Sequence, residues 1–281
     1  MIQWLAGEGW RRESFMASIP PMGGDGGSIS SEEPGQVPTT ARPAARAADA
    51  PGPPNASDDD FPATLAQHGI ELPGGQIEQL ARFRRLLWQW NAKLNLTRHT
   101  DDQKFIGRDV RDSLAFAQVL GPKEKVLDVG TGGGVPGVIL AILRPDLNVW
   151  LCDSVGKKAE AVADIVAQLG LNVPVIHGRA QDLLGPSVYN SLVVRAVGRL
   201  KDILQWFRPH WEHFDRLLAL KGPAWVEERG EARHRGLLND LALRKLVSYP
   251  LPGTQSESVL LQICPKDRMV DDKTCRLTPL G

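Results

Sequence analysis

The chain has 281 residues, 42% of them hydrophobic, and a formal net charge of zero. This length allows one large domain or two modest ones, and the apolar content is ample for a buried core. No apolar run approaches the length that spans a bilayer, and the spacing of the three cysteines argues against a disulfide framework or a zinc site. We therefore expect a cytoplasmic protein without a membrane anchor, and a monomer.

The first part of the chain differs from the rest in composition and charge. Residues 1–60 carry four arginines and nine acidic side chains, a net charge of −5, whereas the remainder carries +5. Proline, glycine, serine, alanine, threonine and acidic residues dominate positions 17–60, which leaves little apolar surface to offset the entropy lost on ordering. We expect a disordered extension over 1–60 and order from about Phe61.

A helical, basic segment is expected over 61–120. Apolar side chains recur at three- and four-residue intervals from Ile77 through Leu80, Phe83, Leu87, Trp90 and Leu94. This spacing predicts a helix with Phe83 and Trp90 in the core, and it leaves Trp88 for contact with a partner. A second helical stretch is predicted over 102–120. Residues 82–125 carry ten Lys or Arg and five acids, which indicates either a phosphate-binding surface or an ordinary solvated face.

Strand and helix patterns alternate over the core region, 121–265, and a tail of 266–281 follows. Strands are expected near 126–129, 148–152, 173–177, 191–195 and 216–220. Helices are expected in the intervals, notably at 136–143, 156–169 and 200–210. This alternation predicts a mostly parallel α/β sheet with right-handed crossovers. The last two runs, 245–250 and 258–264, flank a Pro-Gly turn and predict an antiparallel hairpin.

A glycine-rich loop follows the first predicted strand, within Val126–Gly137. The spacing of Gly132, Gly134 and Gly137 fits the dinucleotide fingerprint, but this pattern alone is weak. Asp128 at the mouth of the strand would repel a pyrophosphate and suits a ligand with an ammonium group, such as S-adenosylmethionine. Alternatively, Asp128 caps the helix that follows. Asp153, about 20 residues further on, stands where a ribose hydroxyl pair is usually bound.

Several motifs occur in a fixed order along the chain: Trp90-Asn91-x-x-Leu94-Asn95-Leu96-Thr97, Arg108-x-x-x-Asp112-Ser113, Asp128-x-Gly130-x-Gly132-x-Gly134-x-Pro136-Gly137, Asp153-Ser154-x-Gly156-Lys157-Lys158, Arg179-Ala180-Gln181-Asp182, Arg195-Ala196 and Leu220-Lys221-Gly222. Together they resemble the bacterial small-subunit (16S) rRNA guanine-N7 methyltransferase family, RsmG or GidB, over about residues 65–265. The resemblance implies a Rossmann-like class I S-adenosylmethionine-dependent methyltransferase fold.

The resemblance also implies ligand contacts. Gly130, Gly132 and Val135 would cradle the methionine and sugar portions of the cofactor, and Ala180 with Gln181 would lie at the adenine. Arg195 falls on a cofactor-site arginine of the family. The chain departs from the family pattern at Asp109, where a histidine is usual, and at Val193-Val194, which many members replace with Ser or Thr before the arginine.

The expected reaction requires no general base, because guanine N7 already carries an in-plane lone pair. Catalysis would come from in-line orientation and the exclusion of water, so no catalytic residue is assigned. The expected partner is small-subunit rRNA or a 30S-type particle, with backbone contacts from Arg84, Arg85, Arg98, Arg108 and Arg111. His210-x-x-His213 does not complete a metal motif, and no metal is expected. A nicotinamide-dependent oxidoreductase and a non-catalytic RNA-binding module remain as alternatives.

Overall fold

A computed structural model of the chain describes residues 60–185, 188–251 and 255–269. The predicted extension, apart from Asp60, therefore lies outside the described residues, as do most of the tail and the centre of the Pro-Gly turn. The first helix begins at Phe61, where order was expected. None of the helices in the described ranges combines the length and the apolar character needed to span a membrane.

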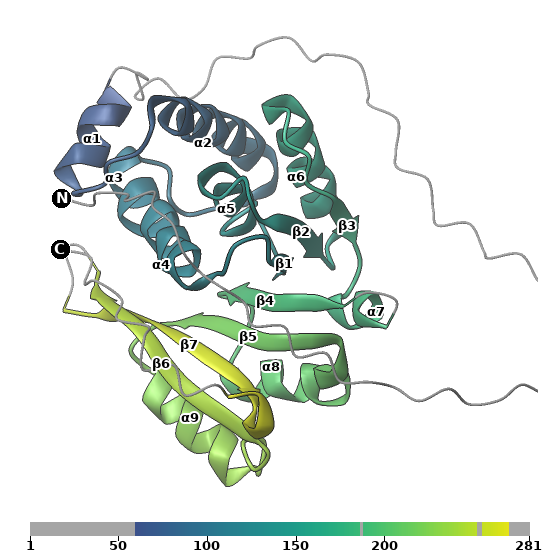
Figure 1. Ribbon diagram of the computed structural model, residues 1–281. Coiled ribbons are helices and arrows are strands. Elements are labelled where there is room, and N and C mark those ends of the chain that lie inside the picture. Colours follow the sequence, from purple (N-terminus) through teal and green to yellow (C-terminus); the bar gives the residue numbers. More distant parts are fainter. Residues whose placement is uncertain (1–59, 186–187, 252–254, 270–281) are drawn as a thin grey trace, which may run out of the picture. The chain divides into compact units, whose positions relative to one another are not determined.

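A seven-stranded sheet forms the centre of the molecule, with the strand order β3-β2-β1-β4-β5-β7-β6 (Figure 1). The strands are β1 (Lys125–Val129), β2 (Asn148–Asp153), β3 (Val175–His177), β4 (Tyr189–Arg195), β5 (Phe214–Lys221), β6 (Leu241–Pro250) and β7 (Glu257–Pro265). The first five strands pair in parallel, whereas β7 is antiparallel to both β5 and β6. This arrangement confirms the predicted α/β class and the terminal hairpin.

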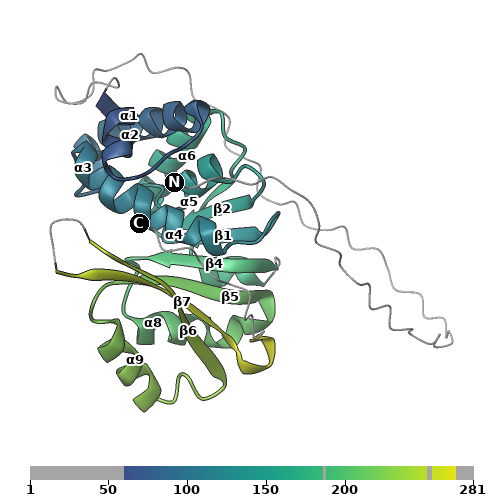
Figure 2. The ribbon, with the colours of Figure 1, turned by 60° about the vertical axis from the view of Figure 1, so that its left-hand side comes forward.

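Helices cover both faces of the sheet (Figures 1 and 2). The longer ones are α1 (Phe61–Gln67), α2 (Gly74–Leu94), α4 (Arg111–Val119), α5 (Gly137–Leu143), α6 (Gly156–Leu169), α8 (Leu200–Phe207) and α9 (Trp225–His234). Shorter pieces are α3 (Asp102–Lys104), a π-helical turn at Phe105–Val110, α7 (Ala180–Leu184), and 3₁₀ turns at Arg208–His213 and Lys266–Arg268.

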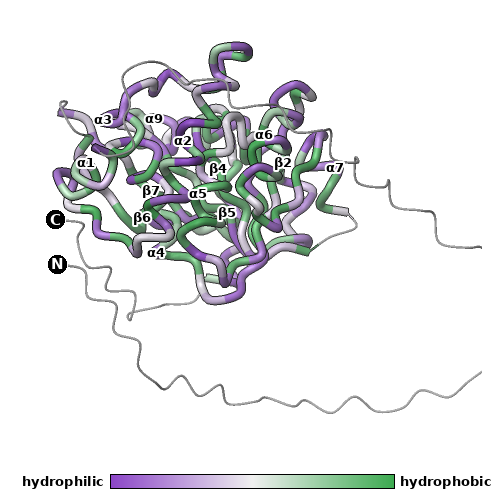
Figure 3. The backbone as a smooth tube through the Cα atoms, turned by 90° about the horizontal axis from the view of Figure 1, so that it is seen from above, coloured by the Kyte–Doolittle hydropathy of each residue, from purple (hydrophilic) through white to green (hydrophobic). Residues whose placement is uncertain are grey.

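Alternate residues of the strands supply two separate hydrophobic cores. Val126 packs with α2, α4, α5 and α6 on one face, whereas Leu127 packs with α7, α8 and α9 on the other. Side chains of a strand point alternately to opposite faces, so a parallel strand covered on both sides is apolar throughout. The hydrophobic segments of α5, β4 and β5 accordingly run through the middle of the molecule (Figure 3).

The basic helical segment packs onto the first of these cores. Phe83 of α2 is fully buried, as predicted, and Trp90 is half-buried, with its indole Nε1 donating to Asp164 Oδ2 of α6 at 2.7 Å. Trp88, predicted to contact a partner, is instead buried, and its Nε1 donates to the backbone oxygen of His99 at 2.8 Å. Trp88 lies on the buried face of α2, because it follows Leu80 and Arg84 at four-residue intervals and both of these side chains are buried.

Several elements differ from the sequence prediction, among them β6, which begins at Leu241 rather than at 245. β3 begins only at Val175, after Pro174, which has no amide to donate to a strand ladder. α8 ends at Phe207 and a 3₁₀ turn follows, since Pro209 cannot continue an α-helix. α9 was not predicted, and of its side chains only Ala232 is buried, so its apolar pattern is weak.

Candidate active site

The predicted cofactor residues converge at one edge of the sheet. In the strand register Val129 lies opposite Cys152 and Val194, so Gly130, which follows β1, is level with Asp153 and Arg195, the last residues of β2 and β4. Gly130 N donates to the Cys152 oxygen at 2.9 Å, which fixes the start of the glycine loop against β2. Ala180 and Gln181 are the first residues of α7, which begins shortly after β3. The strand β3 pairs in parallel with β2, so α7 begins near the same edge of the sheet. The carboxyl ends of parallel strands are the usual ligand site of such a fold.

Two glycines show why the loop tolerates no larger residue. Gly130 has φ +68°, and a Cβ at this position would lie 3.2 Å from Val197. A Cβ on Gly137 would lie 2.1 Å from a methyl carbon of Leu151 and 2.6 Å from Asp128 Oδ2. The first glycine is required by its conformation and the second by the close approach of the loop to β1 and β2.

Asp128 holds this loop from inside. Its Oδ2 accepts a hydrogen bond from the Thr131 hydroxyl at 2.7 Å and another from the Gly137 amide at 2.9 Å. The alternative interpretation, a carboxylate that caps the following helix, therefore describes this oxygen. The other oxygen, Oδ1, is buried and has no hydrogen-bond partner among the residues that the structure describes. Burial raises the pKa of the carboxyl, 1% exposed, to about 6.

Asp153 holds the same loop from β2. Its Oδ2 accepts from the Gly132 amide at 2.9 Å, and its Oδ1 accepts from the Val155 amide at 2.8 Å. Each carboxylate oxygen has a second lone pair, so both oxygens can still accept a hydroxyl. The two acids thus fix the loop at Gly132 and at Gly137, and each keeps unused capacity to accept a hydrogen bond.

Arg195 is bound by two buried carboxylates rather than standing free. Its Nε donates to Asp112 Oδ2 at 2.7 Å and its Nη2 donates to Asp109 Oδ1 at 2.6 Å. Burial opposes the charge of the guanidinium, but these two carboxylates more than compensate and raise its pKa. The π-helical turn carries Asp109, and such turns commonly occur where a helix directs a side chain into a functional site.

Two further side chains complete this network. His99 Nδ1 lies 2.8 Å from Asp109 Oδ1, and the Tyr249 hydroxyl donates to Asp112 Oδ1 at 2.5 Å. Burial and the neighbouring carboxylate raise the pKa of Tyr249 well above its ordinary value. The residue that departs from the family pattern, Asp109, is therefore a buried carboxyl group paired with Arg195. Asp112 belonged to a recognised motif, but nothing in the sequence indicated His99 as a partner of Asp109 or Tyr249 as a partner of Asp112.

The five arginines predicted to contact RNA are not equivalent. Arg84 is fully buried, forms an ion pair with Asp102, and has its guanidinium carbon 4.8 Å from the centre of the Phe61 ring. Its predicted role on the surface is wrong, because Arg84 lies on the inward side of α2 and Asp102 supplies the opposite charge. Arg111 is half-buried and donates to the His68 oxygen at 2.9 Å. Arg98 is exposed, and the remaining two, Arg85 and Arg108, are half-buried.

An exposed indole lies beside the glycine loop. Trp206 of α8 is 39% exposed, which is more than any other tryptophan in the described part of the chain. A Cβ on Gly198 would lie 3.3 Å from its ring, and the preceding residue, Val197, is the one that contacts Gly130. The sequence did carry a signal, because Trp206 falls outside the buried stripe of α8.

Comparison with known proteins identifies the family. The family model GidB, described as rRNA small subunit methyltransferase G, matches residues 76–249. The Ribosomal RNA small subunit methyltransferase G of Rhodopirellula baltica is 48% identical over 200 residues, which cover 71% of this chain and 87% of that protein. Proteins of the same name from Chlorobaculum tepidum and Clostridium novyi are 38% and 36% identical, over 59% and 57% of this chain and 77% and 68% of their own. The chain belongs to the rRNA small subunit methyltransferase G family.

Proposed function

We propose that this protein transfers the methyl group of S-adenosylmethionine to N7 of a guanine in small-subunit rRNA. Membership of the family makes it an S-adenosylmethionine-dependent rRNA methyltransferase. The observation that carries the assignment to this site is the buried, unpartnered oxygen of Asp128 in the glycine loop. We infer that it acts as a monomer in the cytoplasm, where small subunits are assembled.

The loop fits a cationic ligand better than a pyrophosphate. A buried carboxylate oxygen without a partner destabilises the folded protein unless a donor or a positive charge reaches it. The α-ammonium group of the cofactor would satisfy Asp128 Oδ1, directly or through a water, while Oδ2 keeps its two bonds to the loop. A nicotinamide dinucleotide would place negative phosphates against the same oxygen, which argues against an oxidoreductase. A non-catalytic RNA-binding module would leave the loop unexplained.

The other cofactor contacts follow the edge of the sheet. Asp153 would accept the ribose hydroxyls on the lone pairs that its bonds to Gly132 and Val155 leave open. Gly130, Gly132 and Val135 would surround the methionine and sugar portions, and Ala180 with Gln181 would lie against the adenine. Arg195 is held by Asp109 and Asp112, so we assign it the positioning of the loop after β4 and a contact with the cofactor through its remaining donors.

The mechanism needs no proton transfer before the methyl group moves. Bound S-adenosylmethionine supplies an activated methyl group on a sulfonium centre. Guanine N7 is a lone-pair nucleophile, so this chain has only to hold it in line with that methyl group and exclude water, which can contribute several kcal/mol. The exposed ring of Trp206 would stack on the splayed guanine, and Arg98 would contact the RNA backbone.

Transfer of a labelled methyl group tests the proposal. The wild-type protein is incubated with methyl-labelled S-adenosylmethionine and one of three acceptors: protein-free small-subunit RNA, small-subunit particles, or large-subunit RNA as the control. The RNAs come from cells without this methyltransferase, so that the target position is unmodified. We expect label in small-subunit RNA and none in large-subunit RNA. Equal labelling of both, or binding of the cofactor without transfer to any of them, would contradict the assigned substrate.

A further inference from the structure

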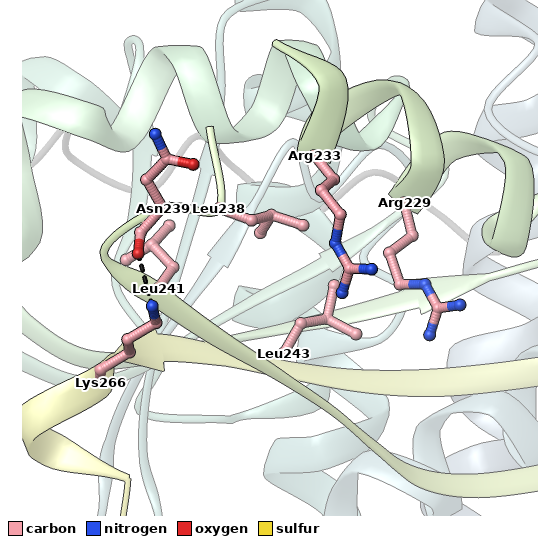
Figure 4. Close-up of a pocket in the computed structure, with 7 residues that line it drawn as sticks. All are labelled: Arg229, Arg233, Leu238, Asn239, Leu241, Leu243 and Lys266. Atoms are coloured by element: carbon pink, nitrogen blue, oxygen red, sulfur yellow. Dashed lines mark hydrogen bonds between the residues drawn. The ribbon is translucent and has the colours of Figure 1, made fainter. Parts of the chain in front are cut away.

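A basic groove lies between α9 and the edge strand β6 (Figure 4), and the strand order places β6 four strands away from β1, which carries the glycine loop. Its volume is about 450 Å³, and three cations and three leucines line it together with Asn239: Arg229, Arg233, Lys266, Leu238, Leu241 and Leu243. No carboxylate lines the groove among the residues that the structure describes. Arg229 and Arg233 point from the same side of α9 toward β6, and Lys266 stands at the far end (Figure 4).

The two arginines of the groove have no ionic partner in the described ranges. Arg229 lies over an aromatic ring, with its guanidinium carbon 5.1 Å from the centre of the Trp225 ring. Arg233 is exposed and forms no ion pair with any described residue. They lie four residues apart on one helix, so their side chains are neighbours on the same face. Two unpaired guanidinium groups side by side repel each other, which a bound anion would relieve.

Two of the three acidic residues of α9 form ion pairs away from the groove, and the third, Glu227, is exposed and does not line it. Glu228 lies 2.9 Å from Lys221 Nζ, and Glu231 lies 2.6 Å from Lys201 Nζ and 3.1 Å from Arg199 Nη2. These contacts are made with α8, with Arg199 at its N-terminal end, and with the end of β5. Glu228 and Glu231 therefore lie toward the sheet and α8, whereas Arg229 and Arg233 point into the groove (Figure 4).

We propose that this groove is a second RNA-binding site, which holds the phosphate backbone of the substrate away from the base that is methylated. The inference rests on the proposed rRNA substrate. Guanidinium groups bind phosphate oxygens in a fork geometry, and such contacts add affinity without reading sequence. Lys266 Nζ donates to the backbone oxygen of Asn239 at 2.6 Å, which leaves two further N–H donors for phosphate groups of the same RNA backbone.

The groove is close enough to the glycine loop for one RNA molecule to contact both. The register connects Leu127 of β1 to Leu243 of β6 at the same level through Leu192, Leu217 and Ile263. These residues span four strand spacings of about 4.8 Å each, so the groove lies roughly 20 Å across the sheet from the strand that carries the loop. A folded RNA segment easily exceeds this length.

The double variant Arg229→Gln/Arg233→Gln tests the site directly by RNA binding. Dissociation constants for protein-free small-subunit RNA are measured by filter binding over a range of salt concentrations, with S-adenosylmethionine affinity measured in parallel. We expect about tenfold weaker RNA binding near physiological salt, a salt slope smaller by about 2, and unchanged cofactor affinity. The matched control is Arg235→Gln at the C-terminal end of α9, which removes a charge that is paired with Glu231 at 3.3 Å.

Several results would overturn the inference. RNA binding by the double variant within twofold of that of the Arg235→Gln control would exclude the groove as a phosphate site. A defect seen only with assembled particles, and not with protein-free RNA, would indicate a ribosomal protein as the occupant. Because the assay measures binding, it does not depend on methyl transfer. If the wild-type protein transferred no methyl group to RNA, the proposed function would be contradicted, but the comparison of RNA binding between the variants would still test the groove.

Discussion

Replacing Asp128 by asparagine is expected to stabilise the protein and weaken its binding of the cofactor. Burial raises the pKa of this carboxyl from its ordinary value of 3.8 to about 6. This shift of about 2 units corresponds to about 3 kcal/mol of unfavourable free energy for the ionised form in the folded protein. Asparagine has a similar shape and no charge, and its amide oxygen can still accept the Gly137 amide.

The sign of the pH dependence follows from the raised pKa. Between about pH 4 and pH 6 the folded protein binds this proton more tightly than the unfolded chain does, so the stability of the wild-type protein falls as the pH rises. The Asp128→Asn variant lacks this titration. Its free energy of unfolding should therefore match that of the wild type near pH 4 and exceed it by up to about 3 kcal/mol at pH 8. Urea unfolding at both pH values measures the difference.

Binding of ligands separates this stability effect from function. Loss of the charged partner of the ammonium group should weaken S-adenosylmethionine binding at least tenfold, since a hydrogen bond to a charged group contributes about 1.5–3 kcal/mol. Adenosine lacks the amino-acid portion, so its affinity should not change, which makes it the control ligand in a calorimetric titration. An Asp128→Asn variant that is less stable than the wild type at pH 8, or that binds S-adenosylmethionine equally well, would refute the reasoning.

Three other predictions concern the network, the loop and the exposed indole. Asp109→Asn should lower the free energy of unfolding by about 3 kcal/mol in urea titration, because it leaves a buried arginine short of a partner, whereas Lys104→Gln at an exposed pair should change it by less than about 1 kcal/mol. Gly137→Ala should abolish cofactor binding in calorimetry, since the added Cβ has no room. The control Gly230→Ala, with nothing within 4 Å of the added Cβ, should leave cofactor binding unchanged and leave the free energy of unfolding unchanged or slightly raised. Trp206→Ala should reduce methyl transfer about tenfold at unchanged cofactor affinity, with recovery in Trp206→Phe, and equal rates for all three proteins would contradict base stacking.

Local patterns in the sequence were sufficient for most of the fold. The glycine loop, the five parallel strands and α6 (Gly156–Leu169) were predicted correctly, because each depends on residues close together in the chain. α9 has little apolar periodicity, since only Ala232 is buried, and no local rule distinguishes it from a polar loop. The limits of the strand β3 and the helix α8 depended on single prolines.

The errors at the site arose from contacts between distant residues. Arg84 was placed on the surface because it falls outside the apolar stripe that begins at Ile77, but the chain supplies Asp102 eighteen residues later as its charged partner. Trp88 was misplaced because it also falls outside that stripe, whereas the buried face of the helix is wider. The network around Arg195 joins β4 to Asp109, which is 86 positions away in sequence, and Asp112 to Tyr249, which is 137 positions away. Pairings of this kind depend on the fold and leave no local pattern.

Mapping the methylated atom tests the central claim most directly. Small-subunit RNA that lacks the modification is incubated with the protein and S-adenosylmethionine, cleaved by chemistry specific for N7-methylguanine, and sequenced at the cleavage site. The account predicts strand scission at a single guanine that depends on both the protein and the cofactor. Methylation of another atom, or at many unrelated guanines, would contradict the proposed in-line transfer to one positioned N7.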